Sequence, residues 1–279
     1  MNDPTWKKSA SSTSVTTLWM LCSLSVFLSL TCASYPTGRL LPASPTATPP
    51  DSPSALPSDS PIFHEDFNGQ LAPAWRWQNE DASHYKLNED GWLEITGGDE
   101  SILAGGQQTN LLWITLPEGE IEISIHLKSQ PLFDFQRAGL LLYRDSDNYV
   151  SLARGHCTQC VLGGNGIFLE YSFDGQHEKY SIPFNGADLY LMLMIEQGVV
   201  SAFYAVDADQ WQHVASVENG IRFERAALSV TNDSAWDNGY DVVGKFDYLE
   251  IRLPTQSAPT PTPNGFQQAG IFRGQQRIL

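Results

Sequence analysis

The sequence predicts an all-β protein, a two-sheet antiparallel sandwich. Apolar residues alternate with polar ones at a period of two, and short strand-like runs are separated by turn-forming residues. No segment of helical length has apolar residues at a 3.6-residue period. Many short strands without helices bury their apolar faces by packing one sheet on another, so a sandwich is the expected architecture.

The stretch Ala138–Arg154 shows the strand-turn-strand pattern most clearly. An apolar run from Leu140 to Tyr143 enters a polar segment at 145–148 (DSDN), and a second run leaves it from Tyr149 to Ala153. Acidic and amide side chains form local hydrogen bonds with the backbone and therefore favour turns. The stretch predicts a β-hairpin, and turn formation accounts for its acidic residues.

The remaining strands follow from the same alternation. The run 120–127 (EIEISIHL) directs its isoleucines and Leu127 to one side and Glu120, Glu122, Ser124 and His126 toward water. The run 189–195 is nearly all apolar, which predicts a central strand covered on both faces, and Gln197-Gly198 predicts a tight turn into 199–206. Further strands are expected at 92–95, 111–115, 166–173, 211–217, 227–230 and 245–253.

The composition excludes some classes of partner. The formal net charge is -16, from 16 Lys+Arg and 32 Asp+Glu. Proteins that bind polyanions concentrate positive charge, so we expect no nucleic-acid partner and no binding to anionic membranes through bulk charge. Aromatic residues make up 11% of the chain, which is enough to supply both a β-core and a stacking surface.

The N-terminus has the pattern of an export signal. Lys7 and Lys8 precede an apolar run at 18–30 that is short for a membrane span, so residues 1–33 are expected to be a signal peptide. A signal peptidase could cleave after Ala33. Alternatively, LSLTC at 28–32 resembles a bacterial lipobox, in which Cys32 would be lipidated, although Thr31 replaces the usual Gly or Ala. The protein is expected at the outer face of the cell membrane as a lipoprotein, or secreted.

Two segments have linker composition. Residues 34–61 are rich in Pro, Ser, Thr and Ala, and residues 254–279 begin with PTQSAPTPTP. Such sequences cannot bury enough apolar surface to offset the entropy of ordering, so a disordered stalk and a disordered tail are expected. The folded unit is then 62–253, the size of one β-sandwich, and it is expected to be a monomer whose contact with membranes is limited to a possible N-terminal lipid.

The order of these elements resembles a known family, the concanavalin A-like domains at the C-terminus of certain β-xylosidases, and the related regulation-of-enolase-type domains. The resemblance rests on FHEDFNG (63–69), LAPAWRW (71–77), GWLEI (91–95), the Ala138-Gly139 hairpin, FYAVDADQW (203–211) and FDYLEI (246–251). In the motif FYAVDADQW, Ala208-Asp209 stands where the family has Asp-Gly. The resemblance implies a jelly roll that covers nearly the whole folded unit.

A structural calcium ion is one expectation. Glu65, Asp66 and Asp247 lie in the first and last expected strands, which often pair in jelly rolls, and hard oxygen ligands suit Ca²⁺. Concanavalin A-like domains often hold such an ion. The alternative is that these carboxylates face water at the strand edges.

Cys157 and Cys160 form the most distinctive local motif, HCTQC at 156–160. A Cys-x-x-Cys pair can be a redox motif, half of a zinc site or a local disulfide. No helix or βαβ unit accompanies it, and no second cysteine pair follows the signal segment. For an exported protein a disulfide that closes the loop is therefore the favoured interpretation.

An enzymatic function is less favoured than binding. Glu118, Glu120 and Glu122 share one strand face, but Ser124 stands where a further carboxylate would be needed for a glycosidase pair. We therefore expect no catalysis; hydrolysis of glycosides remains the less favoured alternative.

Binding of a polysaccharide or other glycan is the favoured function. Sugar-binding sandwiches use aromatic rings and amide or charged groups. Trp92 and Trp211 lie in strand patterns and are expected in the core, whereas Trp236 and Tyr240 lie in a polar loop and are candidate ligand contacts. Tyr143, Arg144 and Asn148 around the hairpin form a second candidate patch. The alternative is a surface lipoprotein with a structural or protein-binding role and no glycan ligand.

Overall fold

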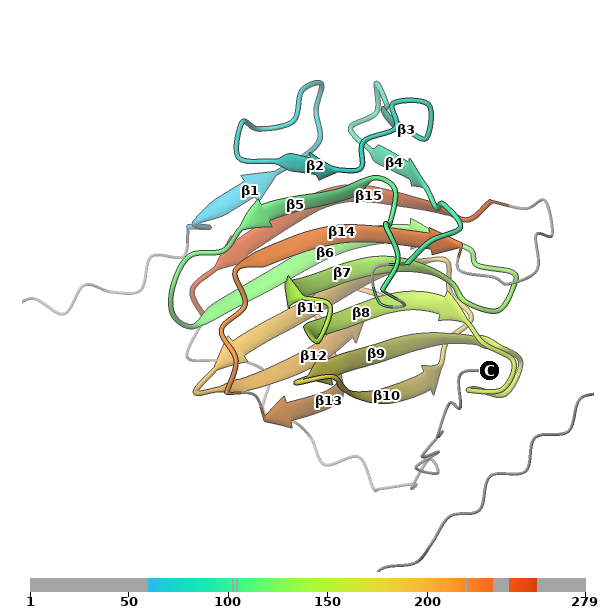
Figure 1. The fold of residues 1–279 in the computed structure, drawn as a ribbon. Helices are drawn as coiled ribbons and strands as arrows, with labels where there is room; N and C mark the ends of the chain where they lie inside the picture. Colours follow the sequence, from blue (N-terminus) through green and yellow to red (C-terminus); the bar gives the residue numbers. More distant parts are fainter. Residues whose placement is uncertain (1–59, 102, 104, 219, 233–240, 255–279) are drawn as a thin grey trace, which may run out of the picture. The chain divides into compact units, whose positions relative to one another are not determined.

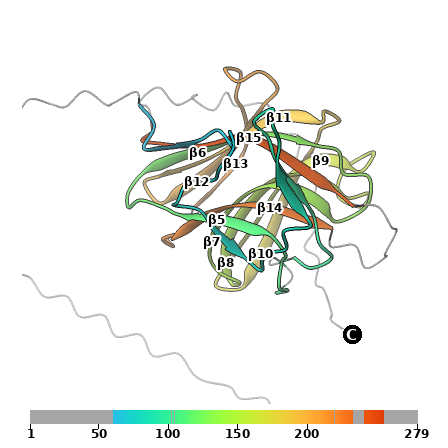
Figure 2. The same ribbon diagram turned by 90° about the horizontal axis from the view of Figure 1, so that it is seen from above.

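The computed structural model describes residues 60–101, 103, 105–218, 220–232 and 241–254, and its named elements there are all β-strands. The strands lie in two antiparallel sheets (Figure 1), which Figure 2 shows as two layers. This confirms the predicted fold class. No helix in this part of the chain is long and apolar enough to cross a membrane.

The first sheet, sheet A, contains both ends of the domain. Its order is β13 (Gln212–Glu218), β12 (Val199–Ala205), β11 (Asp188–Glu196), β6 (Ile121–Ser129), β15 (Val243–Arg252), β4 (Leu93–Thr96) and β3 (Tyr85–Leu87). The short strand β1 (Phe63–Glu65) pairs with β15, as expected for the first and last strands of a jelly roll.

The second sheet, sheet B, lies in front of sheet A in Figure 1. Its order is β10 (Gln176–Pro183), β9 (Asn165–Phe173), β8 (Asn148–His156), β7 (Gln136–Asp145), β14 (Arg225–Asn232), β5 (Leu111–Thr115) and β2 (Arg76–Gln78). The hairpin predicted around Asp145 is formed by β7 and β8 at the centre of this sheet.

The core lies between the sheets and follows the sequence alternation. Ile121, Ile123, Ile125 and Leu127 of β6 are at most 1% exposed, and alternate residues of β7 and β8 are buried in the same cluster. A fully buried Ile or Leu side chain contributes about 1.5–3 kcal/mol relative to its exposed state, so this alternation is the main source of the fold's stability.

The turns use the chemistry that the sequence predicts. Asp145 Oδ1 accepts hydrogen bonds from Asp147 N at 3.0 Å and from Asn148 Nδ2 at 2.8 Å. Asn148 Oδ1 accepts a further bond from the backbone of Asp174, in the next hairpin turn. Between β11 and β12, Gln197 and Gly198 both have positive φ, as a two-residue hairpin turn of type I′ requires.

The outer face of β6 differs from its prediction as a wet face. Ser124 is only 6% exposed, and the His126 side chain only 11%. Tyr190 of β11 stacks on the His126 ring at 4.3 Å between centroids, and Tyr248 of β15 lies within 6.4 Å of the same ring. Large side chains from the neighbouring strands therefore cover polar positions that the alternation alone places in water.

The predicted disulfide between Cys157 and Cys160 is present. Both cysteines pack with Val161 against Phe168 of β9, so the disulfide-closed loop lies on the outer side of sheet B. Asp134 Oδ1 accepts a hydrogen bond from Thr158 N at 2.7 Å, which ties this loop to the segment before β7.

Candidate functional site

The outer face of sheet B, turned away from the core, carries a row of aromatic and basic side chains across the strands. The strand registers place neighbouring members of the row opposite each other or one pair apart. We call it the transverse row; its members, from β2 to β10, are Arg76, Trp113, Arg225, Tyr143, Tyr149, Ser172 and His177.

The centre of the transverse row is a cation between two rings. The Arg225 guanidinium carbon lies 5.1 Å from the ring centroid of Trp113 and 5.1 Å from that of Tyr143. All three side chains are half-buried, so their outer surfaces remain open to solvent. Burial raises the pKa of Tyr143 while Arg225 opposes the rise, and the net direction is upward. Rings held in this way provide a rigid stacking surface.

The second half of the row is polar. The Tyr149 hydroxyl lies 3.0 Å from His177 Nδ1, within hydrogen-bonding distance. Burial raises the pKa of Tyr149, and the charge of Glu170 adds to the rise, so this hydroxyl stays protonated near neutral pH. His177 itself is exposed on β10, the edge strand of the sheet.

A charged group lies beside the row. Glu170 of β9 pairs with Arg137 of β7 and, at 3.7 Å, with Lys179 of β10. Arg137 is 8% exposed, and its Nε is buried without a hydrogen-bond partner among the described residues. A buried donor of this kind normally bonds to water or to a ligand acceptor.

The floor beneath these groups is made of the buried Leu141 and of small residues. Gly139, Ser151, Ala153, Ala227 and Ser229 occupy outward positions at the centre of the sheet. At one end Gln108 is hydrogen bonded to Ser229 at 3.0 Å, so the segment before β5 borders the floor. The arrangement is a low floor with taller aromatic and basic side chains along one side.

The structure separates the sequence-predicted ligand residues. Tyr143 lies in the transverse row, but Arg144 alternates to the other side of β7, and the side chain of Asn148 is used in the two hairpin turns. Arg144 and Asn148 thus lie outside the transverse row, at the turn, and their ligand role stays a prediction. Trp236 and Tyr240 lie outside the described residues; their loop follows Asn232, at the other end of β14 from Arg225.

Sequence reasoning missed Trp113, Arg225, Arg76 and His177. The alternation of β5 places Trp113 on the same face as Leu111. It does not show to which sheet β5 belongs or which residues lie beside Trp113, because these depend on strand pairing. Trp92, expected in the core, is also corrected. It is half-buried near the outer face of sheet A, with Lys128 Nζ 4.3 Å from its ring centroid. Trp211, likewise expected in the core, is half-buried against an outer cluster of Met192, Met194 and Phe203.

The calcium prediction is wrong for Glu65. Its buried carboxylate accepts three hydrogen bonds, from the backbone N of Phe67 at 3.1 Å and of Ala72 at 2.8 Å, and from Trp75 Nε1 at 3.0 Å. These donors leave the carboxylate committed to the fold. Because successive strand residues point to opposite faces, Glu65 points inward and the following Asp66 points out.

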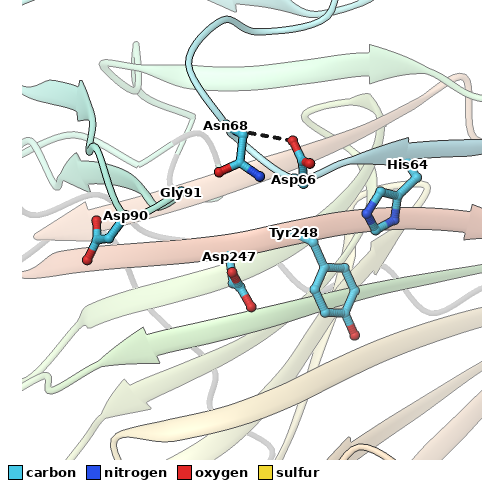
Figure 3. Close-up of a pocket in the computed structure, with 7 residues that line it drawn as sticks. All are labelled: His64, Asp66, Asn68, Asp90, Gly91, Asp247 and Tyr248. Atoms are coloured by element: carbon cyan, nitrogen blue, oxygen red, sulfur yellow. Dashed lines mark hydrogen bonds between the residues drawn. The ribbon is translucent and has the colours of Figure 1, made fainter.

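Asp66 and Asp247 line one pocket of about 220 Å³ with Asn68, Asp90 and Gly91, among others (Figure 3). Hydrogen bonds from Asn68 lower the pKa of Asp66, and Asp247 bonds to His126 Nδ1 at 2.8 Å. The oxygen donors have the chemistry that Ca²⁺ prefers. Within the described ranges, however, no three acidic, His or Cys side chains converge closely enough to hold a metal ion.

The two sheets, the pairing of the terminal strands and the aromatic outer face define a concanavalin A-like β-sandwich. Residues 64–227 match the family model of the β-xylosidase C-terminal concanavalin A-like domain, and the chain belongs to this family. A sequence comparison with curated proteins found no match.

Solved structures with the same fold include enzymes that contain such a domain. The GH43 protein BlXynB from Bacillus licheniformis is 17% identical with a TM-score of 0.60, over 68% of this chain and 39% of that one. A xylan β-1,4-xylosidase from Bacillus halodurans is 21% identical with a TM-score of 0.57, over 73% and 41%. The chain therefore spans about two fifths of these proteins. The Bacillus licheniformis β-glucanase is 9% identical with a TM-score of 0.52, over 69% and 98%.

Proposed function

We propose that this domain is a non-catalytic module that binds a glycan chain on the outer face of sheet B. The observation that carries the proposal is the Trp113–Arg225–Tyr143 group, two half-buried rings held on either side of a guanidinium. Sugar rings present apolar faces that stack on aromatic side chains, while their hydroxyls bond to charged and polar groups. The transverse row supplies both kinds of group along the length of several sugar units.

The carboxylates on this face support binding rather than hydrolysis. A glycosidase needs two carboxyl groups flanking the scissile bond. Among the outward-facing strand positions of sheet B that the structure describes, Glu170 is the one acidic residue, and it is paired with Arg137 and Lys179. The relatives' names, a xylan β-1,4-xylosidase among them, favour a plant-type polysaccharide as the first ligand to test.

Binding is tested by retention on a panel of insoluble polysaccharides. We expect Trp113→Ala and Tyr143→Ala each to weaken retention roughly tenfold to thirtyfold, because each removes one stacking ring, a contact worth about 1.5–2 kcal/mol. Trp92→Ala is the matched control, since it removes a half-buried Trp that lies near the outer face of the opposite sheet. Retention of none of the polysaccharides by the wild-type protein would overturn the proposal. Unchanged retention in both variants would mean that the glycan does not bind on the outer face of sheet B.

The proposal includes export and tethering to the cell surface through a lipid on Cys32. It rests on the apolar run at 18–30 and the lipobox-like LSLTC, which lie outside the described residues. Incorporation of labelled fatty acid into the wild-type chain but not into Cys32→Ser is the measurement that checks it.

We also retain calcium as a proposed ligand of the Asp66–Asp247 pocket, with Asp90 in place of Glu65. We expect millimolar calcium to raise Tm relative to EDTA, because a ligand at about 100 times its Kd stabilises the folded state by about 2.7 kcal/mol. Asp90→Asn is expected to remove the calcium response while leaving Tm in EDTA unchanged, since Asp90 is exposed. Equal Tm in calcium and EDTA for the wild type would contradict a calcium site.

A further inference from the structure

Charge is distributed unequally between the two outer faces of the sandwich. The outward strand positions of sheet B hold four basic residues and one acidic residue: Arg76, Arg137, Lys179 and Arg225, with Glu170. Those of sheet A hold four basic and seven acidic residues: Lys86, Lys128, Lys245 and Arg252, with Glu94, Glu122, Asp188, Glu196, Glu218, Asp247 and Glu250. Sheet B is thus locally basic in a chain of net charge -16.

The basic groups of sheet B are also less neutralised. In the described part of the chain Arg225 has no carboxylate within 4.0 Å, and its Nη2 donates a hydrogen bond to the carbonyl of Arg144 at 3.4 Å. Arg76 is exposed and bonds to the carbonyls of Pro73 and Trp75. On sheet A, by contrast, Lys86, Lys128, Lys245 and Arg252 each pair with a carboxylate.

We infer that the glycan bound by the transverse row is anionic and carries carboxylate or sulfate groups along its chain. This inference rests on the proposed function and specifies its ligand. A planar guanidinium held between two rings can bond to a carboxylate or sulfate in its plane while sugar rings stack beside it. Charges farther than roughly 8 Å from the contact are largely screened at physiological salt, so the charges of the face itself weigh more in binding than the net charge of the chain.

The test uses one xylan backbone in three forms: glucuronoxylan, the same polymer after reduction of its carboxyl groups, and sulfated xylan. Affinity electrophoresis of the whole protein in each polymer gives the relative Kd. We expect at least one charged form to bind about tenfold more tightly than the neutral form, which is the effect of one charge-assisted hydrogen bond. The stronger of the two charged forms identifies carboxylate or sulfate as the recognised group.

Two variants locate the effect. Arg225→Gln is expected to lower the affinity for the charged polymer about tenfold, to that of the neutral polymer, and Arg225→Lys to keep part of the preference. Arg76→Gln, at an exposed position that tolerates substitution, is expected to lower the affinity for the charged polymer severalfold. This variant tests the inference even where Arg225→Gln fails to fold. Lys86→Gln removes the same charge from sheet A and is expected to change nothing.

The outcomes separate this inference from the proposed function. Equal binding of neutral and charged xylan would overturn the inference and leave glycan binding in place. A preference for the charged forms that survives in both Arg225→Gln and Arg76→Gln would also overturn it, because the anionic group would then be recognised elsewhere. Binding of no polymer here or in the insoluble panel would overturn both.

Discussion

Replacing Glu65 by glutamine is expected to destabilise the domain by about 3 kcal/mol, or roughly 10 °C in Tm. The carboxylate is 5% exposed and accepts hydrogen bonds from two backbone amides and from the Trp75 indole. Glutamine has nearly the same shape but offers one acceptor oxygen, and its amide group turns donors toward donors. Bonds to a charged acceptor are stronger than neutral ones, so the loss exceeds that of an ordinary hydrogen bond.

The measurement is urea denaturation followed by tryptophan fluorescence. Glu118→Gln is the matched control, because the Glu118 side chain is 78% exposed and its 2.7 Å ion pair with Arg222 lies at the surface. It is expected to cost less than about 1 kcal/mol. The loss in Glu65→Gln is expected to be the same in calcium and in EDTA. A loss seen with calcium alone would return Glu65 to the metal site from which the structure removes it.

The sequence predicts those parts of the fold in which local pattern and burial agree. The alternation of β6 identifies its buried side, and the polar segment at 145–148 identifies the turn between β7 and β8. Strand β10 was missed because its residues QHEKYSIP are almost all exposed and show no apolar face. Polar and charged residues on an edge strand prevent pairing with other chains. Such a strand lacks the apolar alternation from which strands are predicted.

The candidate site is less predictable because its residues meet only through strand pairing. Tyr143 was identified from its own turn, whereas Trp113 and Arg225 reach it from strands far away in the sequence. The alternation shows that Arg225 and Ala227 share a face, but the register that sets them opposite Tyr143 and Leu141 depends on the whole sheet. The same reason explains why Ser124 and His126 were expected in water: the tyrosines that cover them lie in β11 and β15.

The two outer faces suit different roles on physical grounds. On sheet A the four basic residues are paired with carboxylates and the calcium candidate pocket lies beside the terminal strands, which favours a stabilising role. Glu94 is an example: burial disfavours its charge, but hydrogen bonds from Lys245, Lys86 and Asn88 outweigh burial and lower its pKa to about 2. On sheet B the cation between two rings has no such partner in the described residues. A cation that contacts two aromatic rings and has no carboxylate partner can bond to an anionic ligand.

Replacing Gly139 by alanine is expected to be as destabilising as the change at Glu65, about 3 kcal/mol. A Cβ at this position would lie 2.2 Å from the Leu152 carbonyl oxygen and 2.6 Å from Ala153 Cα. Both atoms belong to the backbone of β8, whose ladders to β7 and β9 fix its position. The added methyl group can be accommodated only by moving the two central strands of sheet B apart, which breaks ladder hydrogen bonds and distorts the floor of the candidate site.

Denaturation in urea measures this effect, and Gly220→Ala provides the comparison. A Cβ at Gly220 meets no atom within 4 Å, so that variant is expected to change stability by less than about 0.5 kcal/mol. Alanine normally suits a strand better than glycine by roughly 0.5–1 kcal/mol. A Gly139→Ala protein as stable as the wild type would therefore mean that β7 and β8 can separate at little cost. The position of Tyr143 relative to Arg225 would then change with them.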